Sequence, residues 1–207
     1  MSIVVSRYNN SPIVSSCYLI KDKKSGRVLI VDPGTKNMSY IISDNTGKFI
    51  DKIILTHEHF DHIGGCNYLF ERFNVPILCS SYCAEAVRDA KKNMSLFHEP
   101  PGFVVKSTSK IIDNYGATIH WNGNQCVFYK TLGHSLGGIC FTIGIYLFTG
   151  DSLIKDLRTV TKLKTGSKEK LIESLKLFET LKGNGYIVCP GHGEMFDLDT
   201  YDLSKVL

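Results

Sequence analysis

The chain has 207 residues, of which 43% are hydrophobic and 21% are charged, and its formal net charge is +4. These values are typical of a globular protein with a full hydrophobic core. The sequence lacks both a run of about 18 apolar residues and a dense block of Lys and Arg, so we expect neither a membrane partner nor a nucleic acid partner.

The seven cysteines are odd in number, and most of them lie inside apolar stretches without a CxxC pair. This pattern favours reduced, buried thiols over a disulfide framework. Residues Met1–Arg7 do not have the basic and apolar regions of a signal peptide. We therefore expect a cytoplasmic protein that folds as a single domain over residues 1–207, and the sequence leaves its oligomeric state open.

The first half of the chain is predicted to begin with a hairpin and then to alternate between strands and helices. In chain order, we predict strands at 15–20 and 27–31, a short helix at 38–43, a strand at 52–55, a helix at 63–73, a strand at 76–79 and a helix at 82–91. Residues 93–107 are predicted to be irregular, and a loop of this length inside a compact domain is often functional.

The second half is predicted to contain short strands and one long helix. The strands are expected at 117–121, 126–130, 139–143, 146–149 and 186–189. Ser167 can cap the helix, which ends before Gly183. The apolar face of this helix is predicted to contain Leu171, Ile172, Leu175, Phe178 and Leu181. The order of elements predicts an α+β fold, a four-layer αβ/βα sandwich with two sheets packed face to face.

One stretch, Thr56–Gly65, holds three imidazoles and two carboxylates within six residues. It follows an apolar strand, and a strand that ends in a dense cluster of His and Asp is typical of a metal site. His57 and His59 are alternate residues of an extended segment, so both imidazoles can face one ion. Asp61 and His62 lie where the chain enters the next helix, and we expect them to face a second position nearby.

Three further candidate ligands, His134, Asp151 and His192, each follow a predicted strand and lie beside glycine. With them, the chain offers seven ligands, which are too many for one tetrahedral zinc ion with an open position. Seven ligands suit two ions that share a carboxylate.

We assign the ligands to two ions, with Asp151 as the bridge. The first ion is predicted to be bound by His57, His59 and His134. The second ion is predicted to be bound by Asp61, His62 and His192. Mixed imidazole and carboxylate ligands suit zinc, and also iron or manganese. A water between the ions would have its pKa lowered to about 7 and would act as a hydroxide nucleophile.

These motifs resemble those of the metallo-β-lactamase superfamily, over nearly the whole chain. The motifs are Val31-Asp32-Pro33-Gly34, His57-x-His59-x-Asp61-His62-x-Gly64-Gly65, Gly133-His134-Ser135, Gly150-Asp151-Ser152 and Pro190-Gly191-His192-Gly193. Within the family, the chain is most similar to single-domain glyoxalase II-like hydrolases. The resemblance implies an enzyme that hydrolyses a small thioester or ester, as hydroxyacylglutathione hydrolases do, with two divalent ions, zinc first among them. Asp61 and Asp151 are its expected catalytic carboxylates.

Other functions stay open as alternatives. Persulfide dioxygenases share this fold and would bind a single Fe(II) on His57, His134 and Asp151. A nuclease of the RNase Z type is disfavoured by the small net charge and by the lack of a basic insertion. A binding protein without catalysis is disfavoured because a structural site does not need seven ligands.

Several residues near the motifs are expected to have roles other than metal binding. Asp32 is expected to hydrogen-bond a ligand imidazole and fix its tautomer. Glu58 is expected to point away from the ligands, and Cys66 and His120 are expected to be structural. His98 is expected to be a surface residue. The cations Lys155, Arg158 and Lys162, after Asp151, are candidates for binding an anionic group of the substrate.

Overall fold

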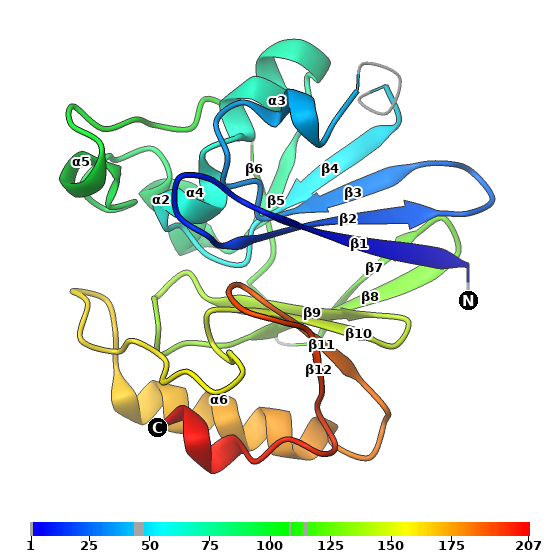
Figure 1. Cartoon of the computed structure of the whole chain (residues 1–207), viewed down its shortest axis with the longest axis vertical. Helices are drawn as coiled ribbons and strands as arrows, with labels where there is room; N and C mark the ends of the chain where they lie inside the picture. The colour runs from blue at the N-terminus through cyan, green and yellow to red at the C-terminus, as the bar shows by residue number, and fades with distance from the viewer. Residues whose placement is uncertain (1, 44–47, 108, 114–115) are drawn as a thin grey trace. The chain divides into compact units, whose positions relative to one another are not determined.

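The computed structural model of the chain describes residues 2–43, 48–107, 109–113 and 116–207. These residues form two compact units, unit 1 (Met1–Ile112) and unit 2 (Asp113–Leu207). Each unit contains one mixed six-stranded sheet with helices (Figure 1). This confirms the α+β class, and the assignment of residues 1–207 to a single domain stays a prediction.

Unit 1 has a sheet with the strand order β1-β2-β3-β4-β5-β6. Its strands are β1 (Ile3–Asn9), β2 (Ser16–Asp22), β3 (Val28–Val31), β4 (Ile50–Ile54), β5 (Ile77–Cys79) and β6 (Ser109–Ile111). The first three are antiparallel, and β3 to β6 are parallel. Its helices are η1 (Met38–Tyr40), α2 (Phe60–Ile63), α3 (Cys66–Phe73), α4 (Ser81–Ala86) and α5 (Ser95–His98). The helices α3 and α4 pack on the sheet through Leu69 and Cys83, which are fully buried in the core of this unit.

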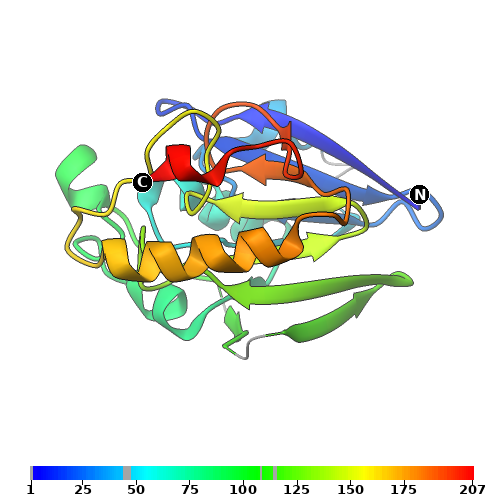
Figure 2. The same ribbon diagram turned by 90° about the horizontal axis from the view of Figure 1, so that it is seen from below.

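Unit 2 has a sheet with the strand order β12-β11-β10-β9-β8-β7. Its strands are β7 (Ala117–Trp121), β8 (Asn124–Lys130), β9 (Ile139–Ile143), β10 (Tyr146–Gly150), β11 (Ile187–Pro190) and β12 (Phe196–Asp197). All neighbours are antiparallel except β10 and β11. The helix α6 (Lys168–Leu181) and the C-terminal turn η2 (Leu203–Val206) lie on the same face of this sheet, as Figure 2 shows.

The strand directions explain why the candidate ligands gather within each unit. In unit 1, Asp32 follows β3 and the segment 55–62 follows the parallel strand β4. In unit 2, β8 and β10 are both antiparallel to β9, and β10 is parallel to β11. The carboxyl ends of β8, β10 and β11 therefore lie at one edge of the sheet, where ligand sites of such sheets commonly form.

Most predicted elements are confirmed, with corrections at their ends. The helix predicted at 63–73 is divided into α2 and α3 by Gly64 and Gly65. The helix predicted at 38–43 is only the single 3₁₀ turn η1. The helix predicted at 82–91 ends at Ala86, after which the amides of Arg88 and Asp89 form turn hydrogen bonds to the carbonyls of Glu85 and Ala86. The strands β1, β6 and β12 were not predicted.

The helix α6 follows its prediction closely. The hydroxyl of Ser167 accepts a hydrogen bond from the amide of Lys170 and caps the first turn. Its buried face contains Leu171, Ser174, Leu175, Phe178 and Leu181. Ile172 was predicted on this face and is instead 37% exposed, because one residue along a helix rotates the side chain by about 100°. None of the helices in the described ranges is long and apolar enough to cross a membrane.

The seven cysteines, all of which lie in described parts of the chain, are free and buried. The prediction of buried thiols is therefore confirmed. Burial raises the pKa of the Cys17, Cys140 and Cys189 thiols. For Cys66, burial and then the negative charge of Asp32 raise the pKa of the thiol. Neutral, enclosed thiols are poor nucleophiles, so these residues serve packing.

Two glycines of unit 1 let the turn after β3 approach the start of α2 closely. A Cβ atom placed on Gly34 would lie 1.7 Å from the carbonyl oxygen of Asp61. A Cβ atom on Gly64 would lie 2.1 Å from the carbonyl oxygen of Gly34. Both positions therefore require glycine, since backbone atoms cannot move away as a flexible side chain can.

We predict that Gly34→Ala lowers the melting temperature by about 4–12 °C, because forcing an extra carbon into a packed site costs roughly 1–3 kcal/mol. Thermal unfolding followed by circular dichroism measures the change. Gly183→Ala is the control, since Gly183 has a φ of +83° and no neighbour within 4 Å of the added carbon. Because Gly34 has no positive φ, a loss in Gly34→Ala that does not exceed the loss in Gly183→Ala would contradict the close contact as the cause.

Candidate metal centre

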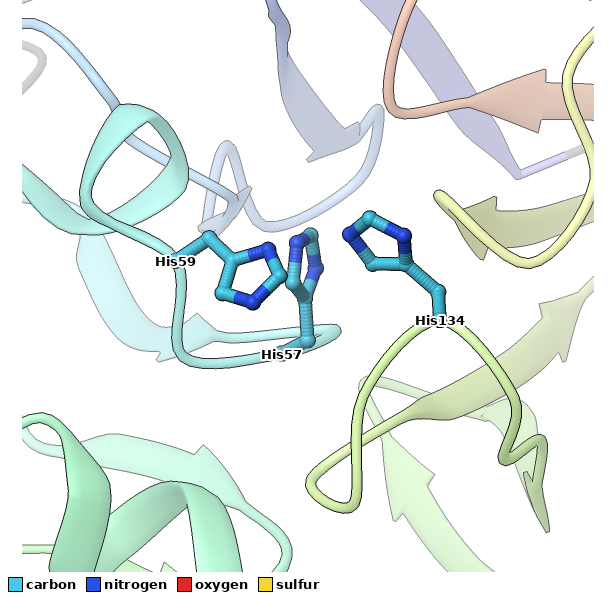
Figure 3. Close-up of side chains that lie close together, drawn as sticks. All are labelled: His57, His59 and His134. Atoms are coloured by element: carbon cyan, nitrogen blue, oxygen red, sulfur yellow. The ribbon is translucent and has the colours of Figure 1, made fainter. Parts of the chain in front are cut away.

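The loop between β4 and α2 brings three imidazoles of unit 1 together. The ring centroids of His57 and His59 are 4.6 Å apart, and those of His57 and His62 are 4.3 Å apart. Figure 3 shows His57 and His59 with their rings next to each other on this loop. All three histidines are buried, with exposed fractions of 6% or less. The extended segment and the first turn of α2 thus bring these rings together, as the motif predicts.

Asp32, which is itself held by Thr56, fixes the orientation of the His62 ring. The carboxylate of Asp32 accepts hydrogen bonds from the amide of Thr56 (2.8 Å) and from its hydroxyl (2.6 Å). Nδ1 of His62 lies 3.2 Å from Oδ2 of Asp32 and donates to it, because a carboxylate can only accept. The predicted hydrogen bond between Asp32 and a candidate ligand imidazole is therefore confirmed. This contact leaves Nε2 of His62 as the nitrogen available for a metal.

The hydrogen bonds of Thr56 assign the tautomer of His57 in the same way. The hydroxyl of Thr56 uses its proton toward Asp32, so it accepts from Nδ1 of His57, 3.1 Å away. Nε2 of His57 is again the nitrogen available for a metal. The donor atoms of Asp32, His57 and His62 all lie within 4.8 Å of one another. Because both oxygens of Asp32 already accept hydrogen bonds, we assign Asp32 to positioning.

The remaining carboxylate of unit 1 is Asp61. Its Oδ2 lies 3.4 Å from Nε2 of His62, and its side chain is 12% exposed. Its backbone carbonyl accepts a hydrogen bond of 2.6 Å from Ser15. The buried amide of Asn10 holds the turn after β3, since its Oδ1 accepts from the amides of Gly34 (2.9 Å) and Thr35 (3.1 Å). The start of α2 is thus held by groups on the β1–β2 loop.

In unit 2, Asp151 lies between two imidazoles. Its Oδ2 is 3.5 Å from Nε2 of His134 and 3.4 Å from Nε2 of His192. The loops that carry Asp151 and His192 are joined by a hydrogen bond from the amide of Gly191 to the carbonyl of Gly150 (2.8 Å). One carboxylate oxygen therefore faces two histidines from two different strand ends.

The loop of His134 (drawn in Figure 3) is fixed by α6 and by the segment 158–162. The amide of Ser167 donates to the carbonyl of Gly133 (2.8 Å), and a Cβ atom on Gly133 would meet the backbone of Leu171 at 2.5 Å. Nδ1 of His134 lies 2.9 Å from the carbonyl oxygen of Val160 and must donate to it. Nε2 of His134 is therefore the nitrogen available for a metal, as in His57 and His62.

The distances between candidate donors fit metal ligands better than hydrogen bonds. Asp61 lies 3.4 Å from His62, and Asp151 lies 3.4–3.5 Å from His134 and His192, whereas hydrogen bonds of this kind are about 2.7–3.2 Å long. Neighbouring ligands of a tetrahedral ion with bonds of about 2.1 Å are about 3.4 Å apart. Buried imidazoles and carboxylates are also the donor set that zinc and iron prefer. The residues present therefore fit divalent metal ions.

Other predicted residues lie around these groups. Glu58 is fully buried, and its negative charge contributes, after burial, to the raised pKa of Tyr82 in α4. Its carboxylate is thus close enough to α4 to act on that phenol. His120 is exposed on β7. His98 is exposed as predicted, but its ring also stacks on Phe60 at 4.3 Å, a contact that the sequence did not predict.

The sequence analysis did not identify several positioning residues: Asn10, Ser15, Thr56 and Val160. Thr56 had a signal, since it stands directly before the ligand motif and after a strand. Val160 had none, because it contributes a backbone carbonyl, which every residue type offers. Polar residues such as Asn10 and Ser15 bond to the backbone of loops that are distant in sequence, so no spacing pattern in the sequence predicts them.

Comparison with known proteins identifies the family. Three solved structures have the same fold. The B3 metallo-β-lactamase BLEG-1 is 22% identical, with a TM-score of 0.84 and coverage of 94% of both chains. TTHA1623, in a di-iron-bound form, is 23% identical, with a TM-score of 0.76 and coverage of 93% of this chain and 94% of that chain. ETHE1 from Myxococcus xanthus is 18% identical, with a TM-score of 0.74 and coverage of 98% and 88%.

The sequence itself matches a family over most of its length. Residues 10–192 match the family model of the metallo-β-lactamase superfamily, a range that includes every candidate ligand. The predicted resemblance to the superfamily and the predicted fold are therefore confirmed. The narrower glyoxalase II-like assignment stays a prediction. The chain belongs to the metallo-β-lactamase superfamily.

Proposed function

We propose that the chain is a metal-dependent hydrolase of small thioesters or esters that uses two divalent ions, as glyoxalase II-like enzymes do. The observation that carries the proposal is Asp151, whose single oxygen Oδ2 faces Nε2 of both His134 and His192 at 3.4–3.5 Å. This is the arrangement expected of a carboxylate shared by two ions. We propose that the donors of both units bind the same pair of ions. The proposed ligands are His57, His59, Asp61, His62, His134, Asp151 and His192.

The tautomers support this assignment. His57, His62 and His134 each use Nδ1 as a donor to a protein oxygen, which leaves Nε2 as the metal-binding nitrogen. A structural role for these histidines would not require the same nitrogen to be available in all three. The family model of the superfamily to which the chain belongs matches residues 10–192, which include all the proposed ligands.

A bound pair of divalent ions supplies polarisation of a carbonyl oxygen and a water of lowered pKa. The protein has to provide orientation and proton transfer. We propose that the carboxylate of Asp61, which is partly exposed beside His62, accepts the proton of the attacking water. Asp151 would be the shared carboxylate, and the buried rings of His57, His59 and His62 would exclude bulk water.

A thioester is the preferred substrate because of its leaving group. A thiol has a pKa of about 8.5, so it leaves as a thiolate without help from a general acid. The only carboxylates among the proposed groups are Asp61 and Asp151, and neither needs to be protonated for this reaction. We also propose a small-molecule substrate and a cytoplasmic location, which the seven free cysteines support.

Iron is the alternative to zinc, and one specific observation favours considering it. TTHA1623, which shares the fold, was solved in a di-iron-bound form. The competing proposal is an oxidoreductase of the persulfide dioxygenase type with a single Fe(II) on His57, His134 and Asp151. One iron per chain, together with oxygen uptake on glutathione persulfide, would replace the hydrolase proposal with this one.

We predict that the purified protein contains two metal ions per chain and hydrolyses members of a panel of thioesters, lactones, β-lactams and phosphodiesters. Asp151→Asn should lose at least one ion and lower kcat/KM by more than about 100-fold, which exceeds the effect of typical outer ligands. Elemental analysis and steady-state kinetics measure both. Glu179→Gln, an exposed change on α6, is the control. Full activity and two ions in Asp151→Asn would exclude a bridging role.

We predict that Asp32→Asn weakens metal binding by about 10–100-fold, because the amide NH₂ opposite Nδ1 of His62 favours the wrong tautomer. Competition with a chromophoric chelator measures the affinity. Asp22→Asn is a matched control, since Asp22 is also 1% exposed and accepts hydrogen bonds from the amide and hydroxyl of Ser25. Equal losses of affinity in both variants would indicate general destabilisation.

A further inference from the structure

Unit 2 contains a groove with a volume of about 360 Å³ beside the segment 158–162. Ligand pockets commonly have volumes of roughly 300–1,000 Å³. We call it the basic groove, because three cations and no acidic residue line it. The lining residues are Arg158, Thr159, Val160, Thr161, Lys162, Lys168, Leu171, Val206 and Leu207. The groove thus combines positive charge with an aliphatic surface.

Two cations of the basic groove carry charges that no acidic side chain balances. Arg158 and Lys162 are exposed and make no ion pair with any residue in the described ranges. Elsewhere, Lys36 pairs with Glu99, Lys106 with Glu71 and Lys182 with Glu179. Two unpaired cations that line one groove favour the binding of an anion there.

The segment that lines the groove also holds the candidate ligands of unit 2. Val160 accepts the hydrogen bond of His134 (2.9 Å) through its carbonyl. The hydroxyl of Thr159 donates to the carbonyl of Asp151 (3.2 Å), and its amide donates to the carbonyl of Val206 (3.1 Å). A ligand in the groove would therefore contact the chain segment that positions both His134 and Asp151.

We propose that the basic groove binds a negatively charged carboxylate or phosphate group of the substrate, carried on an aliphatic body. This inference rests on the proposed hydrolase function and specifies its substrate class as anionic thioesters or esters. Arg158 and Lys162 bind the anion, and Val160, Leu171 and Val206 contact the aliphatic part. Lys155, named with them in the sequence analysis, does not line the groove.

The kinetic test compares a succinyl thioester with its neutral methyl ester in the metal-loaded protein. Arg158→Gln/Lys162→Gln should raise KM for the succinyl thioester by about 3–25-fold, since each exposed charge pair changes an equilibrium by up to about fivefold. The value of kcat should stay unchanged, and high salt should remove the difference. KM for the neutral ester should stay within about twofold of that of the unmodified protein.

The matched control is Lys164→Gln/Lys176→Gln. It also removes two positive charges from exposed positions of unit 2, outside the groove. Its KM should change less than about twofold for either ester. An equal rise of KM in the control, or an equal KM of the unmodified protein for both esters, would overturn the groove as the anion site.

A binding experiment separates this inference from the proposed function. Succinate and inorganic phosphate are titrated separately into the holoprotein, and amide NMR shifts are recorded for residues 158–162 and Leu171. We expect saturable shifts that are absent in Arg158→Gln/Lys162→Gln, and the probe that saturates first identifies carboxylate or phosphate. NMR shifts without turnover of any thioester would refute the proposed hydrolase function but would support the basic groove as an anion site. Turnover of a thioester without these NMR shifts would refute anion binding in the basic groove and would support the hydrolase function.

Discussion

The contact between the turn after β3 and the first turn of α2 is the constraint on which the candidate site of unit 1 depends. Gly34 and Gly64 allow the two backbones to touch, and Asn10 and Ser15 hold the same two segments by hydrogen bonds. This approach places Asp32 behind the imidazole of His62. Without it, three buried imidazoles would have no fixed orientation, and burying them would cost free energy.

The two units orient their candidate ligand histidines with different hydrogen-bond acceptors. In unit 1, a side-chain network of Asp32 and Thr56 receives the Nδ1 protons of two histidines. In unit 2, the backbone carbonyl of Val160 receives that of His134. In both units Nε2 is left as the nitrogen available for a metal, so the site requires an acceptor for each Nδ1 proton, whatever residue supplies it.

Membership of the superfamily and the identity of the substrate depend on different parts of the chain. The ligand motifs lie at strand ends, where the sheets fix them. The basic groove lies on the segment after β10 and beside α6, which can vary without moving a strand. Thr159 donates a hydrogen bond to the carbonyl of Asp151, and Val160 accepts one from His134, so the proposed anion-binding segment directly contacts two of the proposed metal ligands in unit 2.

The sequence by itself determined the α+β class, most of the strands, the capped helix α6 and the superfamily. These follow from local patterns: alternation of apolar residues, a serine cap, and His and Asp at fixed spacings after apolar runs. The same spacings predicted the seven proposed ligands, an assignment that metal analysis will test.

Only the tertiary structure decided the rest. Short or exposed strands such as β1, β6 and β12 have weak local patterns and depend on the neighbours with which they pair. The helices predicted at 38–43 and 82–91 are shorter than predicted, and the second gives way to turns in which the amides of Arg88 and Asp89 donate to Glu85 and Ala86. The positioning groups Asn10, Ser15 and Val160 lie up to 46 residues from the groups they hold. Contacts between distant backbone atoms have no signature in a sequence, because every residue type offers a carbonyl and folding alone brings it within reach.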